Sequence, residues 1–158
     1  MNMHASEMVA VLDAIDPDVT TASTVTSGWI SAANFYAFMA VVLGGTLGVS
    51  SSVTAKIEKA TAAAGTGATD LTGATITALT GSGADSDKQA VISFRQDQLG
   101  HDSGTPYTHF RLSITAGDDG TSPTGTTSDL GGLVLGVFPR VAPASDYDGS
   151  TVDSVTNV

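Results

Sequence analysis

Short segments of alternating apolar and polar residues, separated by loops, are the feature that most constrains the fold of this chain. The alternation is clearest at residues 53–58, 90–95 and 109–115. A period of two places successive side chains on opposite faces of a strand, so these segments are predicted to be strands with one solvent-facing side. Residues 35–43 and 133–138 are apolar at both alternate sets of positions and are predicted to be strands buried on both faces. The pattern therefore predicts an all-β chain.

The loops between these segments, at residues 65–73, 81–87, 101–106 and 117–128, are rich in Gly, Ser, Thr and Asp. Such residues favour turns, because Gly adopts positive φ freely and Asp hydrogen-bonds its own backbone. Six or more short strands joined by turns are typical of an antiparallel sandwich. We predict a single β-sandwich of jelly-roll type. Its core is predicted to contain ten large apolar side chains: Phe35, Met39, Ile57, Ile92, Phe94, Phe110, Leu112, Ile114, Leu133 and Leu135.

Both ends of the chain carry acidic residues without basic ones. All six Lys and Arg residues lie between Lys56 and Arg140, although the 16 acidic residues are spread along the whole chain. Unpaired charges of one sign favour solvated arms over a packed core. We therefore predict an N-terminal arm over residues 1–28, a sandwich domain over 29–141 and an acidic C-terminal tail over 142–158.

The N-terminal arm contains four apolar residues with helical spacing. Met8, Val11, Leu12 and Ile15 stand at i, i+3, i+4 and i+7, which predicts either a short amphipathic helix or an extended arm that orders on contact. Ordering a free arm costs about 1–2 kcal/mol of backbone entropy per residue, so it requires a partner. We expect this arm or the C-terminal tail to lie across a neighbouring subunit, with these four side chains as the partner contact.

The net charge and the apolar pattern exclude two classes of partner. The net charge is −10, and an acidic chain is repelled by the phosphates of nucleic acids. The longest apolar run, residues 35–43, has about half the length that a membrane-spanning helix needs. We therefore predict neither a nucleic-acid nor a membrane partner. Only 14% of the residues are charged, and a surface of Thr, Ser and Gly suits static protein contacts.

No catalytic, cofactor-binding or metal site is predicted from the motifs. The chain has no cysteine, which excludes thiolate ligands and nucleophiles, and it has no G-x-S-x-G elbow for a serine nucleophile. His101, Asp102 and His109 lack the further ligands that a zinc site needs. The acidic pairs carry the oxygen ligands that calcium prefers, but solvated turns explain them better. These pairs are Asp85 with Asp87, Asp118 with Asp119, and Asp146 with Asp148.

The aromatic residues cluster in one segment. Trp29, Phe35, Tyr36 and Phe38 stand close together in an apolar stretch, where packing in the core is favoured over a platform for binding sugar. A glycosidase would in addition need paired carboxylates in a deep cleft.

Six segments carry a resemblance to a known family: VTAKIEKA at 53–60, AAGTGATDLTGATITAL at 63–79, KQAVISFRQDQL at 88–99, YTHFRLSIT at 107–115, LVLGVFPR at 133–140 and the closing VAPASDYDG at 141–149. Together they resemble small β-sandwich virion proteins that are encoded beside the capsid genes of tailed phages. The resemblance covers roughly residues 32–149 and includes a strand with a central arginine.

This resemblance implies a non-enzymatic structural protein of the virion. The expected role is a capsid decoration or cement protein on the outer surface of the phage head, with the major capsid protein as its partner and self-association as a homo-oligomer left open. A neck or tail component is the alternative within the virion. A carbohydrate-binding β-sandwich module is the alternative from another class, because one fold hosts many functions.

Overall fold

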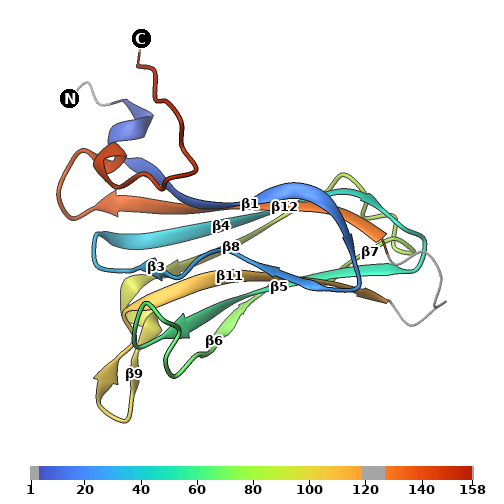
Figure 1. Ribbon diagram of the computed structural model, residues 1–158, viewed down its shortest axis with the longest axis horizontal. Helices are drawn as coiled ribbons and strands as arrows, with labels where there is room; N and C mark the ends of the chain where they lie inside the picture. Colours follow the sequence, from blue (N-terminus) through green and yellow to red (C-terminus); the bar gives the residue numbers. More distant parts are fainter. Residues whose placement is uncertain (1–3, 119–126, 158) are drawn as a thin grey trace.

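Two antiparallel sheets face each other in the computed structural model, which describes residues 4–118 and 127–157 (Figure 1). Sheet A, the upper layer in Figure 1, has the strand order β1-β12-β4-β8, and sheet B, the lower layer, has the order β2-β11-β5-β6. The strands of sheet A are β1 (Val9–Thr21), β12 (Thr127–Pro139), β4 (Phe35–Leu47) and β8 (Gln89–Arg95). Those of sheet B are β2 (Thr24–Thr26), β11 (His109–Asp118), β5 (Ser51–Ala60) and β6 (Thr69–Thr75).

The smaller elements extend these two layers. Strand β3 (Ile30–Ser31) also pairs with β11, β7 (Leu79–Thr80) pairs with β5, and a separate hairpin joins β9 (His101–Asp102) to β10 (Thr105–Pro106). Three 3₁₀ turns are η1 (Ala5–Glu7), η2 (Gln96–Leu99) and η3 (Ala144–Tyr147). The chain crosses repeatedly between the sheets, and its first and last long strands pair in sheet A. The four-stranded sheet A and the six-stranded sheet B, connected in this way, form a jelly roll, as predicted from the sequence.

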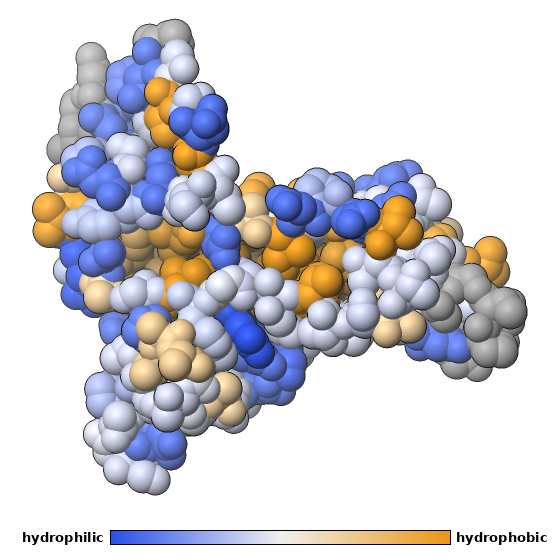
Figure 2. Space-filling model, in the orientation of Figure 1, coloured by the Kyte–Doolittle hydropathy of each residue, from blue (hydrophilic) through white to orange (hydrophobic). Residues whose placement is uncertain are grey.

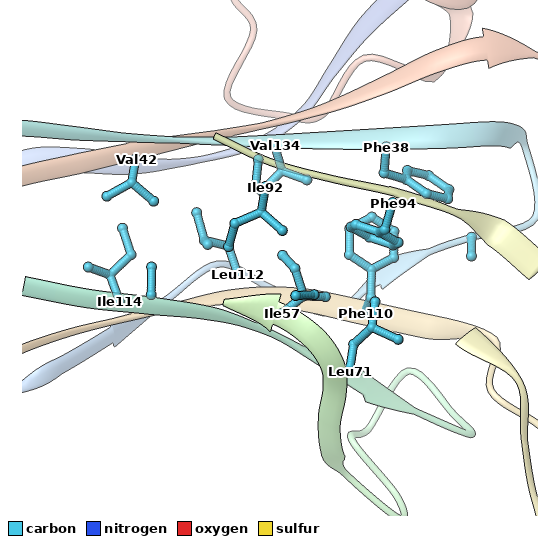
Figure 3. Packing of buried hydrophobic residues seen from close by; sticks show 14 of the residues in the cluster. Phe38, Val42, Ile57, Leu71, Ile92, Phe94, Phe110, Leu112, Ile114 and Val134 are labelled. Carbon is cyan, nitrogen blue, oxygen red and sulfur yellow. The ribbon is translucent and has the colours of Figure 1, made fainter. Parts of the chain in front are cut away.

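The core lies between the sheets and is built from side chains of both layers (Figure 3). The rings of Phe38 and Phe94 from sheet A meet Phe110 from sheet B at centroid distances of 4.5 and 5.0 Å. Seven of the ten predicted core residues are buried there: Phe35, Ile57, Ile92, Phe94, Phe110, Leu112 and Ile114.

The prediction was wrong for Met39, Leu133 and Leu135, which are only partly buried. Their neighbours Phe38 and Val134 are at most 1% exposed and point into the core. Because alternate residues of a strand face opposite ways, the three predicted core residues face away from sheet B.

Residues 9–26 belong to the sandwich and do not form a free arm, which corrects the predicted boundary at residue 28. Of the two alternatives for the N-terminal segment, the structure shows extended chain over Val9–Thr21, preceded by the short 3₁₀ helix η1, and no α-helix among the described residues. Strand β1 pairs with β12 over its length, with an irregularity between Val11 and Asp13. Such a bulge adds one residue to the strand. It lets Leu12 and Ile15 both pack against the core, which explains why their spacing imitates a helix.

The C-terminal segment returns to β1 and packs on its own domain. Ala144 is fully buried, and the Tyr147 ring lies 5.6 Å from the Phe35 ring. The Val11 N–H donates to the Asp148 carboxylate at 2.8 Å, and the Gly149 N–H donates to the Val11 carbonyl at 2.7 Å. The two ends of the described chain thus lie together at one end of sheet A, where they rise above it (Figure 1). None of the helices described is long and apolar enough to cross a membrane.

Candidate partner-binding surface

The solvent-facing sides of the two sheets differ in chemistry. On sheet B, Arg111 donates to Glu58 at 2.6 Å, and Lys56 lies 2.7 Å from Asp70 and 3.2 Å from Glu58. The hydrogen bond to Asp70 raises the pKa of Lys56 above its usual value. The Arg111 guanidinium also lies over the Trp29 ring at 4.6 Å. This side of the sandwich therefore carries the charged network expected of a solvated sheet.

The opposite side of the sandwich, the outer face of sheet A, is apolar on its three longer strands and polar on β8 except at Val91. The pairing register aligns Ala14 of β1 with Leu133 of β12, Val41 of β4 and Val91 of β8 in one continuous row. The neighbouring row joins Val11, Leu135, Met39 and Ser93, and the next joins Val9, Val137, Ala37 and Arg95. We define the outer face of sheet A by its apolar members: Val9, Val11, Ala14, Ala37, Met39, Val41, Leu43, Val91, Leu133, Leu135 and Val137.

Strand β12 shows that this orientation is built into the sequence. Its inward positions include Gly132 and Gly136, whereas its leucines at 133 and 135 face outward. A Cβ on Gly132 would lie 2.9 Å from the Leu112 side chain of sheet B, and a Cβ on Gly136 would lie 2.7 Å from the Phe35 ring. The strand thus buries its smallest residues and leaves its larger side chains partly exposed. A sheet that faced only water would be expected to show the reverse arrangement.

Exposed apolar side chains extend this face at the end where the chain termini meet. A groove of about 510 Å³ is lined by Val9, Met39, Val137 and Phe138, among others. Phe138 is 57% exposed and has a φ of 58°, a backbone conformation that is costly for a large side chain. Met8, whose carbonyl accepts the Phe138 N–H, is 41% exposed. Contiguous exposed apolar area of this kind marks an interaction site.

A second apolar strip lies along the edge of the sandwich between β1 and strands β2 and β3. Figure 2 looks onto this edge and shows apolar residues in a band between the two sheets. Leu12 lines one hollow of about 330 Å³ there, beside Trp29 and Phe35. Ile15 lines a second hollow of about 390 Å³, beside Val25 and Leu130.

The four predicted contact residues therefore lie on two different surfaces. Val11 belongs to the outer face of sheet A and Met8 adjoins it, whereas Leu12 and Ile15 line the edge strip. The larger apolar surface was not predicted from the sequence, because its leucines were assigned to the core. The signal that could have revealed it is that Gly132 and Gly136 share one face of the strand, whereas Leu133 and Leu135 share the other.

The residues considered for metal or acid–base chemistry do not converge. His101 is exposed on β9, and His109 Nδ1 shares a hydrogen bond of 2.9 Å with Thr108. Within residues 4–118 and 127–157, no three His, Asp or Glu side chains are placed so that they could hold a metal ion.

Asp85 and Asp148, each a member of one acidic pair, serve local structure. Asp85 pairs with Lys88 at 2.7 Å and accepts the Thr80 N–H at 3.0 Å. The bond from Lys88 and then the bond from the Thr80 backbone hold the pKa of Asp85 below its usual value. Asp148 fixes the C-terminal segment to β1, and Asp119 lies outside the described residues.

The aromatic cluster is divided between the core and the surface. Phe35 and Phe38 are 1% exposed, whereas Tyr36 is 55% exposed and lies under the Arg140 guanidinium at 4.3 Å. Since two of the four rings are buried, these residues do not present one continuous flat platform for a sugar ring.

Comparison with known proteins connects the fold to viruses. No protein-family model and no curated protein matches the chain. Chains in the structures of infectious bursal disease virus, strains Gx and Gt, match 87% of this chain at 15% identity, with TM-scores of 0.51 and 0.50. A chain of Desmodium yellow mottle tymovirus matches 89% of this chain and 93% of its own length, at 14% identity and a TM-score of 0.42.

This chain corresponds to only about a third of the length of the bursal disease virus chains, since 34% and 33% of them are covered. At such low identity the likeness concerns the fold alone. The sandwich has the architecture of a β-domain found in chains of virus structures.

Proposed function

We propose that this protein is a non-enzymatic structural subunit of a virus particle. The observation that carries the proposal is the apolar, nearly uncharged outer face of sheet A on a jelly roll whose architecture recurs in chains of virus structures. A fold alone does not define a function. An apolar sheet face, however, needs a protein neighbour in an assembly, and a particle shell offers many neighbours.

Within the particle, we propose a decoration or cement protein on the outer head surface of a tailed phage, with the major capsid protein as its partner. The resemblance of residues 32–149 to virion proteins supports this narrower role. Of the four predicted contact residues, Leu12 and Ile15 are the proposed contacts with the capsid, because they line the hollows of the edge strip, whereas Met8 and Val11 are proposed to contact a neighbouring subunit through the outer face of sheet A. A neck or tail component remains the alternative within the virion.

The direct test is the presence and position of the protein in purified particles. Mass spectrometry of gradient-purified virions should detect the chain in many copies, and cryo-electron microscopy should place its sandwich on the outside of the shell. Absence from the particles would refute the virion role. Density confined to the neck or tail would replace the decoration role with the alternative.

A point variant tests the attachment better than a deletion of residues 1–28. That deletion would remove β1 and β2 from the two sheets and would unfold the domain. Ile15→Ser leaves the backbone of β1 intact but removes a side chain that also packs against the core, so its thermal unfolding is measured to show that it is folded at the binding temperature. We expect the folded variant to have lower occupancy on the particles. Thr54→Ser, on the polar side of sheet B, is the matched control and should bind normally. A glycan array addresses the carbohydrate-binding alternative, and specific sugar binding would favour that module over a cement protein.

A further inference from the structure

We propose that a second copy of this chain covers the outer face of sheet A, so that two sandwiches pack sheet against sheet in a symmetric dimer. The inference rests on the proposed structural function and names a partner for its largest apolar surface. It starts from the row of Ala14, Leu133, Val41 and Val91, which crosses all four strands without a polar residue.

Charge supports a second copy as the occupant. At a net charge of −10, two copies repel each other through most orientations. The outer face of sheet A is an exception because the only charged residue in its three central rows is Arg95, at the β8 edge and paired with Asp97 at 3.0 Å. Two such faces can therefore meet without burying an unpaired acid.

The dimensions of the sheet also suit a dimer. On β4 the apolar members of the face run from Ala37 to Leu43, which is about 23 Å at about 3.3 Å per residue, and four strands are about 19 Å wide. The apolar face therefore offers roughly 440 Å² per copy, and the exposed side chains of Met8 and Phe138 adjoin it. A standard interface buries about 800 Å² per partner and weak ones bury less, so the face fits a dimer that dissociates reversibly.

The position of the chain ends restricts the direction of the two-fold axis that relates the two copies. They rise above sheet A at one end only (Figure 1). A two-fold axis parallel to the strands would bring both sets of ends together and make them collide. An axis in the interface plane and across the strands places them at opposite ends, so that each flanks the far end of the partner's sheet. In this arrangement β4 faces β4 and β8 faces β8, with their directions reversed.

The oligomeric state tests the proposal. Sedimentation equilibrium of the full chain should show a monomer–dimer equilibrium. Val41→Asp should raise the dissociation constant at least about 100-fold, because it would bury an uncompensated carboxylate. Thr54→Asp adds the same charge on the polar side of sheet B and should leave the constant within about twofold. A wild-type chain that stays monomeric at millimolar concentration would overturn the proposal.

Chemical cross-linking tests the geometry without disturbing the core, since the chain has no native cysteine. Val91 is 56% exposed at the β8 edge, and in the proposed dimer it lies near Val91 of the second copy. Packed sheets are about 10 Å apart, beyond the reach of a disulfide, so a short bismaleimide is the reagent. Val91→Cys should give a cross-linked dimer and Thr54→Cys should not. The opposite pattern would refute the sheet A interface.

The experiments can refute the dimer and the virion role independently. A chain found in virions that is monomeric and not cross-linked through Val91→Cys would keep the virion role and lose the dimer. A chain that dimerises through this face but is absent from particles would keep the dimer and lose the virion role. Cross-linking of Val91→Cys only to a different protein in the particle would also overturn the second copy as occupant.

Discussion

Gly136 provides a sharp test of how tightly sheet A is packed. This glycine of β12 faces the core, and a Cβ built on it would lie 2.7–2.8 Å from three atoms of the Phe35 ring. The ring is 1% exposed and packs edge-on against Phe38 and Tyr147 at 6.3 and 5.6 Å. Because it cannot move without displacing both neighbours, we predict that Gly136→Ala lowers the free energy of unfolding by about 1–3 kcal/mol, as overpacking does.

Urea denaturation of the purified chain measures this loss. A thermal scan should show a melting temperature lower by about 2–4 °C for each kcal/mol in a chain of this length. Gly117→Ala is the control, because a Cβ on Gly117 of β11 meets nothing within 4 Å. It should change the free energy of unfolding by less than about 0.5 kcal/mol.

A double variant identifies the contact that causes the loss. Phe35→Leu removes ring atoms that the new methyl group would strike, so adding Gly136→Ala to Phe35→Leu should cost less than adding it to the wild type. Equal stability of Gly136→Ala and wild type would refute the tight packing between β12 and Phe35. A full loss that persists in the Phe35→Leu background would place the clash elsewhere.

Three further predictions concern the core, the acid pairs and the C-terminal segment. Phe110→Ala should cost about 3–5 kcal/mol in chemical denaturation, since the ring is fully buried between two others. The hydrogen bond from Lys88 lowers the pKa of Asp85, so the Asp85 carboxylate stabilises the folded state above its unfolded-state pKa. This stabilisation is lost as the pH falls through the folded-state pKa. The melting temperatures of Asp85→Asn and wild type should therefore converge in acid. Asp148→Ala removes the acceptor of the Val11 N–H and should speed hydrogen exchange of that amide.

The strands with one solvent-exposed face were predictable from the sequence, because the alternation of apolar and polar residues determined both their structure and which side faces the core. Ile57, Phe94 and Leu112 were assigned to the core from this alternation, and all three are buried. In β4 and β12 the residues on both sides of the strand are apolar, so the pattern could not decide which side faces sheet B. Gly132 and Gly136 decide it, because Leu112 and Phe35 occupy the space that their side chains would need.

The N-terminal segment was harder to predict because a local irregularity changed its spacing. The bulge near Leu12 converts the alternation of a strand into the spacing of a helix. The unpaired acids of this segment suggested a free arm, yet Asp13 accepts the Gly28 N–H at 2.7 Å within the sandwich. The outward orientation of Leu133 and Leu135 and the strand structure of residues 9–21 were missed for the same reason. Strand pairing is non-local, and it determines which side chains share a face.

The edges of sheet A support its face, and not its border, as the proposed surface for association. An exposed strand edge invites pairing with another chain unless it is bent, charged or covered. At the β1 edge, the C-terminal segment forms hydrogen bonds with both the N–H and the carbonyl of Val11. Pro17 of β1 has no N–H to donate and lies at a register irregularity between Ile15 and Asp18. The β8 edge is short and ends at Arg95, a charged and exposed residue. Since both borders oppose strand addition, packing against the apolar face is the favourable route by which sheet A can contact a neighbour.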